Sequence, residues 1–327
     1  RIRAIHAGLR DDLIAACDQS PAGALAAVAA DAEGDTQFAL DRVSEERLLT
    51  LCADLAGTWP LILIAEGLPD RRGIPLPAGS DAGDAELRII VDPLDGTRGL
   101  MFQKRPAWIL TGVAPNRGAD TSLADIELAV QTEVPLVKQH LCDTWWAVAG
   151  RVAGERLNRL DGETQPLAPT PARATGLAHG YGGLARFFPG DITELAAIED
   201  AVVERILGPK QPGKAHALND QYASTGGQIA ELIAGHDRWM ADLRPLLARA
   251  AHARGRPPAI CCHPYDICTE SIARAAGVQV TDEHGGPLRA ALDASVDVAW
   301  IGYANAEIRA LVEPVLQTVL RERGLLP

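Results

Sequence analysis

The hexapeptide Asp92-Pro93-Leu94-Asp95-Gly96-Thr97 is the most informative stretch of the chain, because it sets two carboxylates three residues apart beside a glycine and a hydroxyl. It follows the apolar run 87–91, whose length predicts a β-strand. Proline, aspartate and glycine favour a turn there, so we expect the carboxylates to lie close together. Crowded carboxylates favour a divalent cation, which takes oxygen ligands. An ordinary acidic surface turn is the alternative interpretation.

The bulk composition limits the class of protein. The chain has 327 residues, a formal net charge of -12, 47% hydrophobic residues and 23% charged residues. This length allows one large domain or two modest ones with a real core. The acidic balance argues against a nucleic-acid partner, which needs a basic patch, but allows a local basic pocket for a phosphorylated small molecule.

Membrane attachment and export are not expected from the sequence. No apolar stretch approaches the ~20 residues that cross a bilayer. The first residues lack the apolar region of a signal peptide. We therefore predict a cytoplasmic protein without a membrane partner. The six scattered cysteines show no paired zinc-binding spacing, so reduced and buried thiols are expected.

Alternating helical and strand-like segments predict a layered protein of the α/β or α+β class. Helices are expected over 5–31, 35–56, 192–206, 224–234, 266–276 and 306–321. Strands are expected over 61–65, 87–91, 108–113, 126–132, 144–149, 176–179, 258–262, 278–281 and 296–301. The glycine-rich stretch 180–183 is expected to be a flexible loop, because it lacks the end of a phosphate-binding loop.

A Pro/Thr-rich stretch without periodicity, residues 161–175, is the expected boundary between two halves. The N-terminal half, 1–160, would be an α+β unit that binds metal. The C-terminal half, 161–327, would be an α/β unit that completes the active site.

Four acids lie where element ends could present them at one site. Glu66 follows the first strand, Asp92 and Asp95 follow the second, and Asp266 is the expected N-cap of a helix. Ligand sites gather at the carboxyl ends of strands. If these acids converge, Asp92 would bridge two cations and the carbonyl of Leu94 could complete their coordination. Taken singly, Glu66 is also explained as a loop acid and Asp266 as a helix cap.

The end of the hexapeptide suggests a phosphate site. Gly96 allows close backbone approach, and a helix that starts at Thr97 would present free amide groups to an anion. The Thr97 hydroxyl could orient an attacking water. Two cations ~3.5–4 Å apart would activate that water and stabilise the leaving oxygen of a phosphate ester.

These residues resemble the inositol monophosphatase family of magnesium-dependent, lithium-sensitive phosphatases, whose superfamily includes fructose-1,6-bisphosphatases and 3′-phosphoadenosine phosphatases. The hexapeptide matches the central signature, and the stretch 265–286 is similar to the second signature. Ala65-Glu66-Gly67, the stretch 35–41 and the stretch 224–237 resemble further family segments. The likeness runs from about Asp35 to Ala306.

The resemblance implies a layered αβαβα sandwich of the sugar-phosphatase type, often assembled as a homodimer. It implies two or three Mg²⁺ per site, with lithium inhibitory, held by Glu66, Asp92, the Leu94 carbonyl, Asp95 and Asp266. It also gives catalytic roles to Glu66, Thr97 and Asp41, where Asp41 orients the threonine. Gly96 and Thr97 would bind phosphate, and Arg98 either contacts the substrate or is solvated.

The chain also departs from the family pattern. Gly67 stands where a second acid is common, and Arg98-Gly99-Leu100 replaces Thr-Asn-Phe. Tyr265 stands where the family has tryptophan. Extra sequence before Asp266 carries the arginines Arg238, Arg244, Arg249, Arg254 and Arg256.

These departures leave the substrate open. We expect hydrolysis of a small phosphorylated metabolite, with a sugar or polyol phosphate such as an inositol phosphate as the first choice. The second choice is 3′-phosphoadenosine 5′-phosphate, because a basic residue followed by glycine is closer to that branch. A non-catalytic member that binds a phosphorylated metabolite is the alternative of a different class, and the retained acids argue against it.

Overall fold

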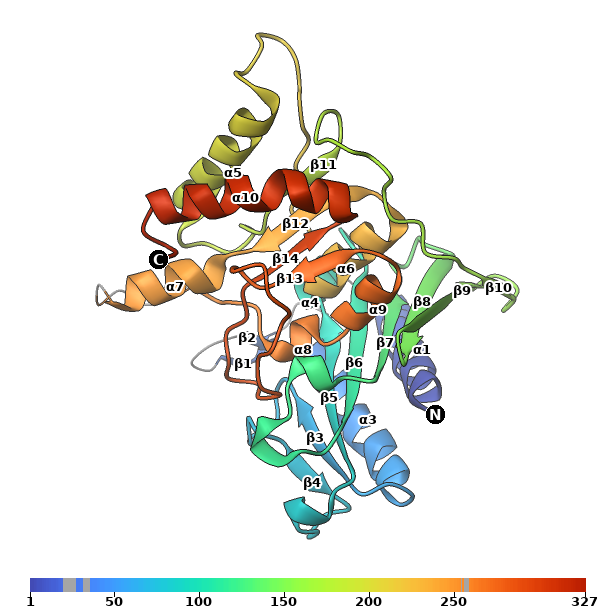
Figure 1. Cartoon of the computed structure of the whole chain (residues 1–327). Coiled ribbons are helices and arrows are strands. Elements are labelled where there is room, and N and C mark those ends of the chain that lie inside the picture. The colour runs from blue at the N-terminus through green and yellow to red at the C-terminus, as the bar shows by residue number, and fades with distance from the viewer. Residues whose placement is uncertain (20–27, 32–35, 254, 256–258) are drawn as a thin grey trace.

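The computed structural model of the chain describes residues 1–19, 28–31, 36–253, 255 and 259–327. Figure 1 shows helices and sheets in alternating layers. None of the helices in these ranges is long and apolar enough to cross a membrane.

The larger sheet has eight strands in the order β10-β9-β8-β7-β6-β5-β3-β4. Neighbouring strands are antiparallel except β3 and β5, which run parallel. The strands are β3 (Leu61–Ala65), β4 (Ile74–Leu76), β5 (Leu87–Asp95), β6 (Ala107–Pro115), β7 (Leu128–Val134), β8 (Leu141–Val148), β9 (Arg151–Asn158) and β10 (Thr164–Pro166).

Two N-terminal helices, α1 (Ile2–Gln19) and α3 (Ala39–Ala56), pack together and cover one face of this sheet. Helix α1 buries Leu9 and Leu13, which lie one turn apart on the same face of the helix. It also buries His6 between the hydroxyls of Thr132 and Thr111 on the sheet. A short antiparallel pair of strands, β1 (Val28–Asp31) and β2 (Thr36–Phe38), precedes α3.

The smaller sheet has four strands in the order β11-β12-β14-β13. They are β11 (Tyr181–Leu184), β12 (Asp237–Asp242), β13 (Gln279–Thr281) and β14 (Trp300–Tyr303). On its outer face lie α5 (Ile192–Leu207) and α10 (Ala306–Glu322), which contact each other and enclose a separate apolar cluster.

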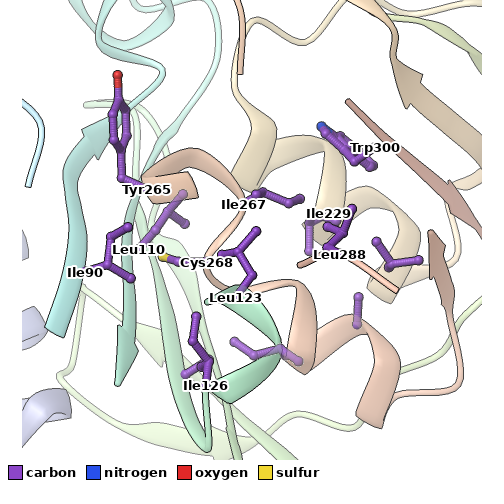
Figure 2. Packing of buried hydrophobic residues seen from close by; sticks show 14 of the residues in the cluster. Ile90, Leu110, Leu123, Ile126, Ile229, Tyr265, Ile267, Cys268, Leu288 and Trp300 are labelled. Carbon is purple, nitrogen blue, oxygen red and sulfur yellow. The ribbon is translucent and has the colours of Figure 1, made fainter. Parts of the chain in front are cut away.

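Three helices lie between the two sheets: α6 (Thr225–Ala234), α8 (Pro264–Ile267) and α9 (Glu270–Ala275). They share the largest apolar cluster with both sheets (Figure 2). Ile90 and Leu110 enter it from the larger sheet, Ile229 from α6 and Trp300 from the smaller sheet. The order helix, sheet, helix, sheet, helix confirms the predicted αβαβα architecture. Two further helices, α4 (Thr97–Met101) and α7 (Arg244–Ala253), follow β5 and β12.

Several predicted boundaries were wrong at the N-terminal end. The last four residues of the expected helix 5–31 form the strand β1 instead, α1 spans Ile2–Gln19, and residues 20–27 of that prediction lie outside the described residues. Thr36–Phe38 is a strand rather than the start of the second helix, because β-branched and aromatic residues suit a pleated pair. Asp35 lies outside the described residues.

Other errors fall in the second half. Residues 180–183 are not a loop, because Tyr181–Leu184 pairs with β12 as the strand β11. The expected strand 176–179 is a turn, and residues 259–262 of the expected strand 258–262 are irregular. The strand expected at 296–301 begins only at Trp300. The stretch between Gly235 and Asp266, predicted to be extra sequence, contains β12, a central strand of the smaller sheet; Arg254 and Arg256 lie outside the described residues.

Candidate active site

The hexapeptide is not a turn after β5, as the sequence predicted, but continues that strand with an irregularity. Asp92 lies opposite Leu110 of β6, and Asp95 lies opposite Trp108. Three steps along β5 therefore match two steps along β6, which is a β-bulge with one extra residue. On a regular strand, residues three apart point to opposite faces. The bulge removes this alternation, so both carboxylates can serve one site.

Asp266 reaches the same site from α8, although it is not the N-cap that the sequence predicted. His263 is the cap and Pro264 starts the helix, which places Asp266 in its first turn. The His263 amide donates to Asp266 Oδ2 over 2.6 Å. Proline is favoured at the first helical position, which explains the earlier start.

Three carboxylates converge. Asp92, Asp95 and Asp266 each offer one oxygen, and these oxygens lie within 4.8 Å of one another. Asp92 and Asp95 are buried, at 1% and 7% exposure. Burial, followed by the neighbouring acids of the site, raises the pKa of Asp92 well above its ordinary range. Burial and then the charge of Asp266 raise the pKa of Asp95 to about 7. The site therefore favours a proton or a cation among these oxygens.

Asp95 is fixed by the start of α6. The Ser224 hydroxyl and the Gly226 amide both donate to Asp95 Oδ2, over 2.8 and 2.6 Å. Ser224 also caps α6 by accepting from the Gly227 amide over 2.8 Å. Gly226 permits this approach, because a Cβ there would lie 2.6 Å from Leu110 Cδ2. Sequence analysis missed Ser224, although its place as a helix cap was a usable signal.

Thr97 and Asp41 meet as the resemblance implied. Thr97 is the first residue of α4, and its hydroxyl lies 2.7 Å from Asp41 Oδ1 and 2.8 Å from the Leu94 carbonyl oxygen. Gly96 precedes it with φ 92°, a left-handed conformation that favours glycine. The Leu94 amide in turn donates to Asp92 Oδ1 over 2.9 Å. The hexapeptide backbone thus links the threonine to the acid cluster.

Glu66 lies at the end of β3 and lines the same pocket, and its charge contributes to the raised pKa of Asp92. Next to it, the carboxylate of Glu45 occupies the space beside Gly67, where a Cβ would overlap it. Glu45 of α3 therefore places a carboxylate beside Gly67, the position at which the resembling family commonly has a second acid. The spacing of Glu45 in the sequence gave no sign of this.

One pocket joins all the expected metal and phosphate residues with others that were not expected. It is lined by Glu66, Asp92, Leu94, Asp95, Gly96, Thr97, Arg98, Phe187, Phe188, Ala223, Ser224, Thr225, Arg244, Ile260, Cys261, His263, Tyr265 and Asp266. Asp41 touches this set through Thr97. Tyr265 packs on the inner core with its hydroxyl turned away from that cluster (Figure 2). That hydroxyl lies 3.1 Å from His263 Nδ1.

Solved structures with the same arrangement of elements identify the fold. Fructose-1,6-bisphosphatase of Leishmania major superposes with a TM-score of 0.67 at 15% identity, over 98% of this chain and 92% of that one. An IMPase of Thermotoga maritima gives 0.61 at 16% identity, over 96% and 94%. This chain has the inositol monophosphatase/fructose-1,6-bisphosphatase fold.

A third structure extends the comparison. A Pyrococcus horikoshii protein with similarities for inositol-1 monophosphatase gives a TM-score of 0.60 at 17% identity, over 98% of this chain and 96% of that one. No family model and no curated protein matches the sequence. The predicted likeness to this superfamily is thus confirmed at the level of the fold.

Proposed function

We propose that the protein is a magnesium-dependent phosphatase that hydrolyses a phosphomonoester of a small metabolite. The observation that carries this proposal is the convergence of Asp92, Asp95 and Asp266 beside a threonine hydroxyl held by a carboxylate. The fold supports it, because solved structures that share it are named as phosphatases of fructose bisphosphate and inositol monophosphate.

The donor set fits a hard divalent cation. Every candidate ligand is oxygen: the carboxylates of Glu66, Asp92, Asp95 and Asp266 and the carbonyl of Leu94. Magnesium prefers such ligands. The raised pKa values of Asp92 and Asp95 mean that their ionised forms are unfavourable when no positive charge lies nearby, and a bound cation would supply that charge. When bound, magnesium would supply an activated water and offset the charge of the leaving oxygen.

The chain's own residues would orient the nucleophile. The Thr97 hydroxyl can donate a hydrogen bond to Asp41 and accept a hydrogen bond from the attacking water. Asp41 would then fix the threonine rotamer by accepting that hydrogen bond. The amides of Gly96 and Thr97 would hold the phosphate. We place Glu66 at the edge of the acid cluster, where its carboxylate can bind a cation or take a proton from the water.

A phosphate-release assay tests the proposal. Purified protein is offered a panel of phosphomonoesters with magnesium, with magnesium replaced by a chelator, and with magnesium plus lithium. We expect release of phosphate only with magnesium and less of it with lithium. Absence of turnover across the panel, with calorimetric binding of one ester, would instead identify a binding protein.

A further inference from the structure

The pocket has a second wall that the acid chemistry does not use. Besides the acids, its lining includes five residues with apolar or weakly polar side chains, which we call the aromatic wall after its two phenylalanines: Phe187, Phe188, Ala223, Ile260 and Cys261. The two phenylalanines follow β11, and their side chains are only half-buried in this chain. The proposed hydrolysis of a phosphate does not require apolar side chains of this kind. We therefore expect them to contact the alcohol part of the substrate.

The two rings are fixed in position. Phe187 and Phe188 pack edge to face, with centroids 4.9 Å apart and planes at 68°. The Arg244 guanidinium lies 4.5 Å from the centre of the Phe187 ring, and the Arg98 guanidinium lies 5.2 Å from that of Phe188. Such arrangements are attractive, because a cation favours the negative face of an aromatic ring. The rings are therefore preorganised rather than free to collapse into the pocket.

Arg244 is itself anchored away from the substrate. It forms a two-point ion pair with Asp242 at the end of β12, and both side chains are almost completely buried. It also donates to the carbonyl of Ile260 over 3.1 Å. Its charge is thus balanced by Asp242, which makes it a support for the rings rather than an anion receptor.

This wall suits only some leaving groups. A sugar or polyol that enters a pocket loses water from its hydroxyls, and each unpartnered hydroxyl costs free energy. The side chains of Phe187, Phe188, Ile260 and Ala223 offer no hydrogen-bond partner. Cys261 offers a weak one, and its thiol already donates to Ala259. A flat apolar group loses nothing on entry and can pack against the rings.

Arg98 ties this wall to the reacting phosphate. It follows Thr97 directly in the chain, and its guanidinium reaches the Phe188 ring. The Arg98 side chain therefore connects the backbone next to the proposed phosphate site with the Phe188 ring. Because Thr97 and Phe188 line the same pocket, a substrate with its phosphate at Thr97 can extend its alcohol part toward that ring.

We propose that the enzyme selects phosphomonoesters of alcohols that carry a flat aromatic group, which packs on the wall formed by Phe187 and Phe188. The inference rests on the proposed phosphatase function and narrows its substrate class. It places aromatic alcohol phosphates ahead of the polyol phosphates that the sequence suggested first.

Two primary-alcohol esters provide the test: 2-phenylethyl phosphate, which carries an aromatic ring, and glycerol 1-phosphate, which does not. Phosphate release with magnesium and titration calorimetry are measured for the wild type, Phe188→Ala and Phe187→Ala. Phe102→Ala is the matched control, because Phe102 is 62% exposed and does not line the pocket. We expect about a tenfold preference of the wild type for the aromatic ester. Phe188→Ala should remove most of it, and Phe102→Ala should keep it.

Each outcome is decisive. Equal kcat/KM and equal affinity for the two esters would overturn the wall proposal while leaving the phosphatase proposal intact. Preferential binding of the aromatic ester without turnover of any ester would overturn the phosphatase proposal and support the wall as a binding surface. A preference that survives both phenylalanine substitutions would show that other residues select the substrate.

Discussion

The two walls of the pocket are held in place by opposite means. On the acidic wall, like charges are crowded together by a strand bulge and by hydrogen bonds from α6, at the cost of raised pKa values. On the aromatic wall, a buried ion pair is already balanced and holds two rings by contact alone. The first arrangement is incomplete without an added positive charge, and the second is complete as it stands. The difference separates the part of the pocket suited to chemistry from the part suited to selection.

Removing one charge from the acidic wall should have the largest effect on turnover. Asp92→Asn takes away the most buried of the three convergent carboxylates. We expect kcat to fall at least about a thousandfold, since the change removes a ligand from the cation site. The measurement is phosphate release, with circular dichroism to check folding. Asp237→Asn is the control, because Asp237 is also buried with a pKa of about 7 but lies outside the pocket lining. Equal losses in both variants would contradict the assignment.

The threonine should come next. Thr97→Val removes the hydroxyl that lies 2.7 Å from Asp41 and should lower kcat by about 10²–10⁴-fold, as for other lost proton-handling groups. Thr97→Ser keeps the hydroxyl and should restore most of the activity. Steady-state kinetics decide the matter: a serine variant as slow as the valine variant would mean that Thr97 acts by shape and not by its hydroxyl.

On the aromatic wall, breaking the ion pair should harm stability more than chemistry. Asp242→Asn leaves Arg244 buried without a full countercharge, which should cost about 3–5 kcal/mol of unfolding free energy. Urea denaturation measures this cost. Glu322→Gln breaks the exposed pair with Arg205, which solvent screens, and should change the unfolding free energy far less than Asp242→Asn does. When the concentrations of folded protein are matched, Asp242→Asn should change kcat on glycerol 1-phosphate little. A loss of kcat as large as that of Asp92→Asn would instead mean that Asp242 takes part in catalysis.

The smallest expected effect is a shift of melting temperature with pH. In the folded protein the pKa of Asp95 is raised to about 7, so this state binds more protons than the unfolded chain below that pH. Without a cation, stability should therefore fall as pH rises from about 4, the ordinary pKa of an aspartate in the unfolded chain, to about 7, and change little above that. Magnesium replaces the lost protons and should flatten this fall, so it should raise the melting temperature more at the higher pH. Thermal melts at the two pH values test this, and an equal magnesium effect at both would count against Asp95 as a ligand.

The sequence predicted the acidic wall far better than the aromatic one. The hexapeptide carries its chemistry in residue types, so Asp92, Asp95 and Thr97 could be recognised before their geometry was known. Even so, the bulge that aligns the two aspartates depends on pairing with β6, and the capping role of His263 depends on Pro264, which favours the first position of a helix. The layered architecture could be predicted because the longer helices and strands alternate clearly.

Residues that act through distant packing could not be recognised in the same way. Phe187 and Phe188 form an ordinary apolar pair in the sequence, and only the placement of Arg98 and Arg244 makes them a wall. The glycines of β11 suggested a loop, yet pairing with β12 makes them a strand. Glu45 comes close to Gly67 only because α3 packs beside the end of β3. In each case the decisive contact joins segments far apart in the chain.

The order in which the acids occur along the chain also has a consequence for synthesis. Asp92 and Asp95 are made early and lie on a strand of the larger sheet, whereas Asp266 and the Ser224 cap of Asp95 arrive with the later segments. N-terminal segments emerge from the ribosome first. A nascent chain that stops before α6 would thus present the hexapeptide without the hydrogen bonds and the third carboxylate that complete the site. High affinity for a cation should therefore be a property that the protein acquires only after α8, which carries Asp266, has been translated.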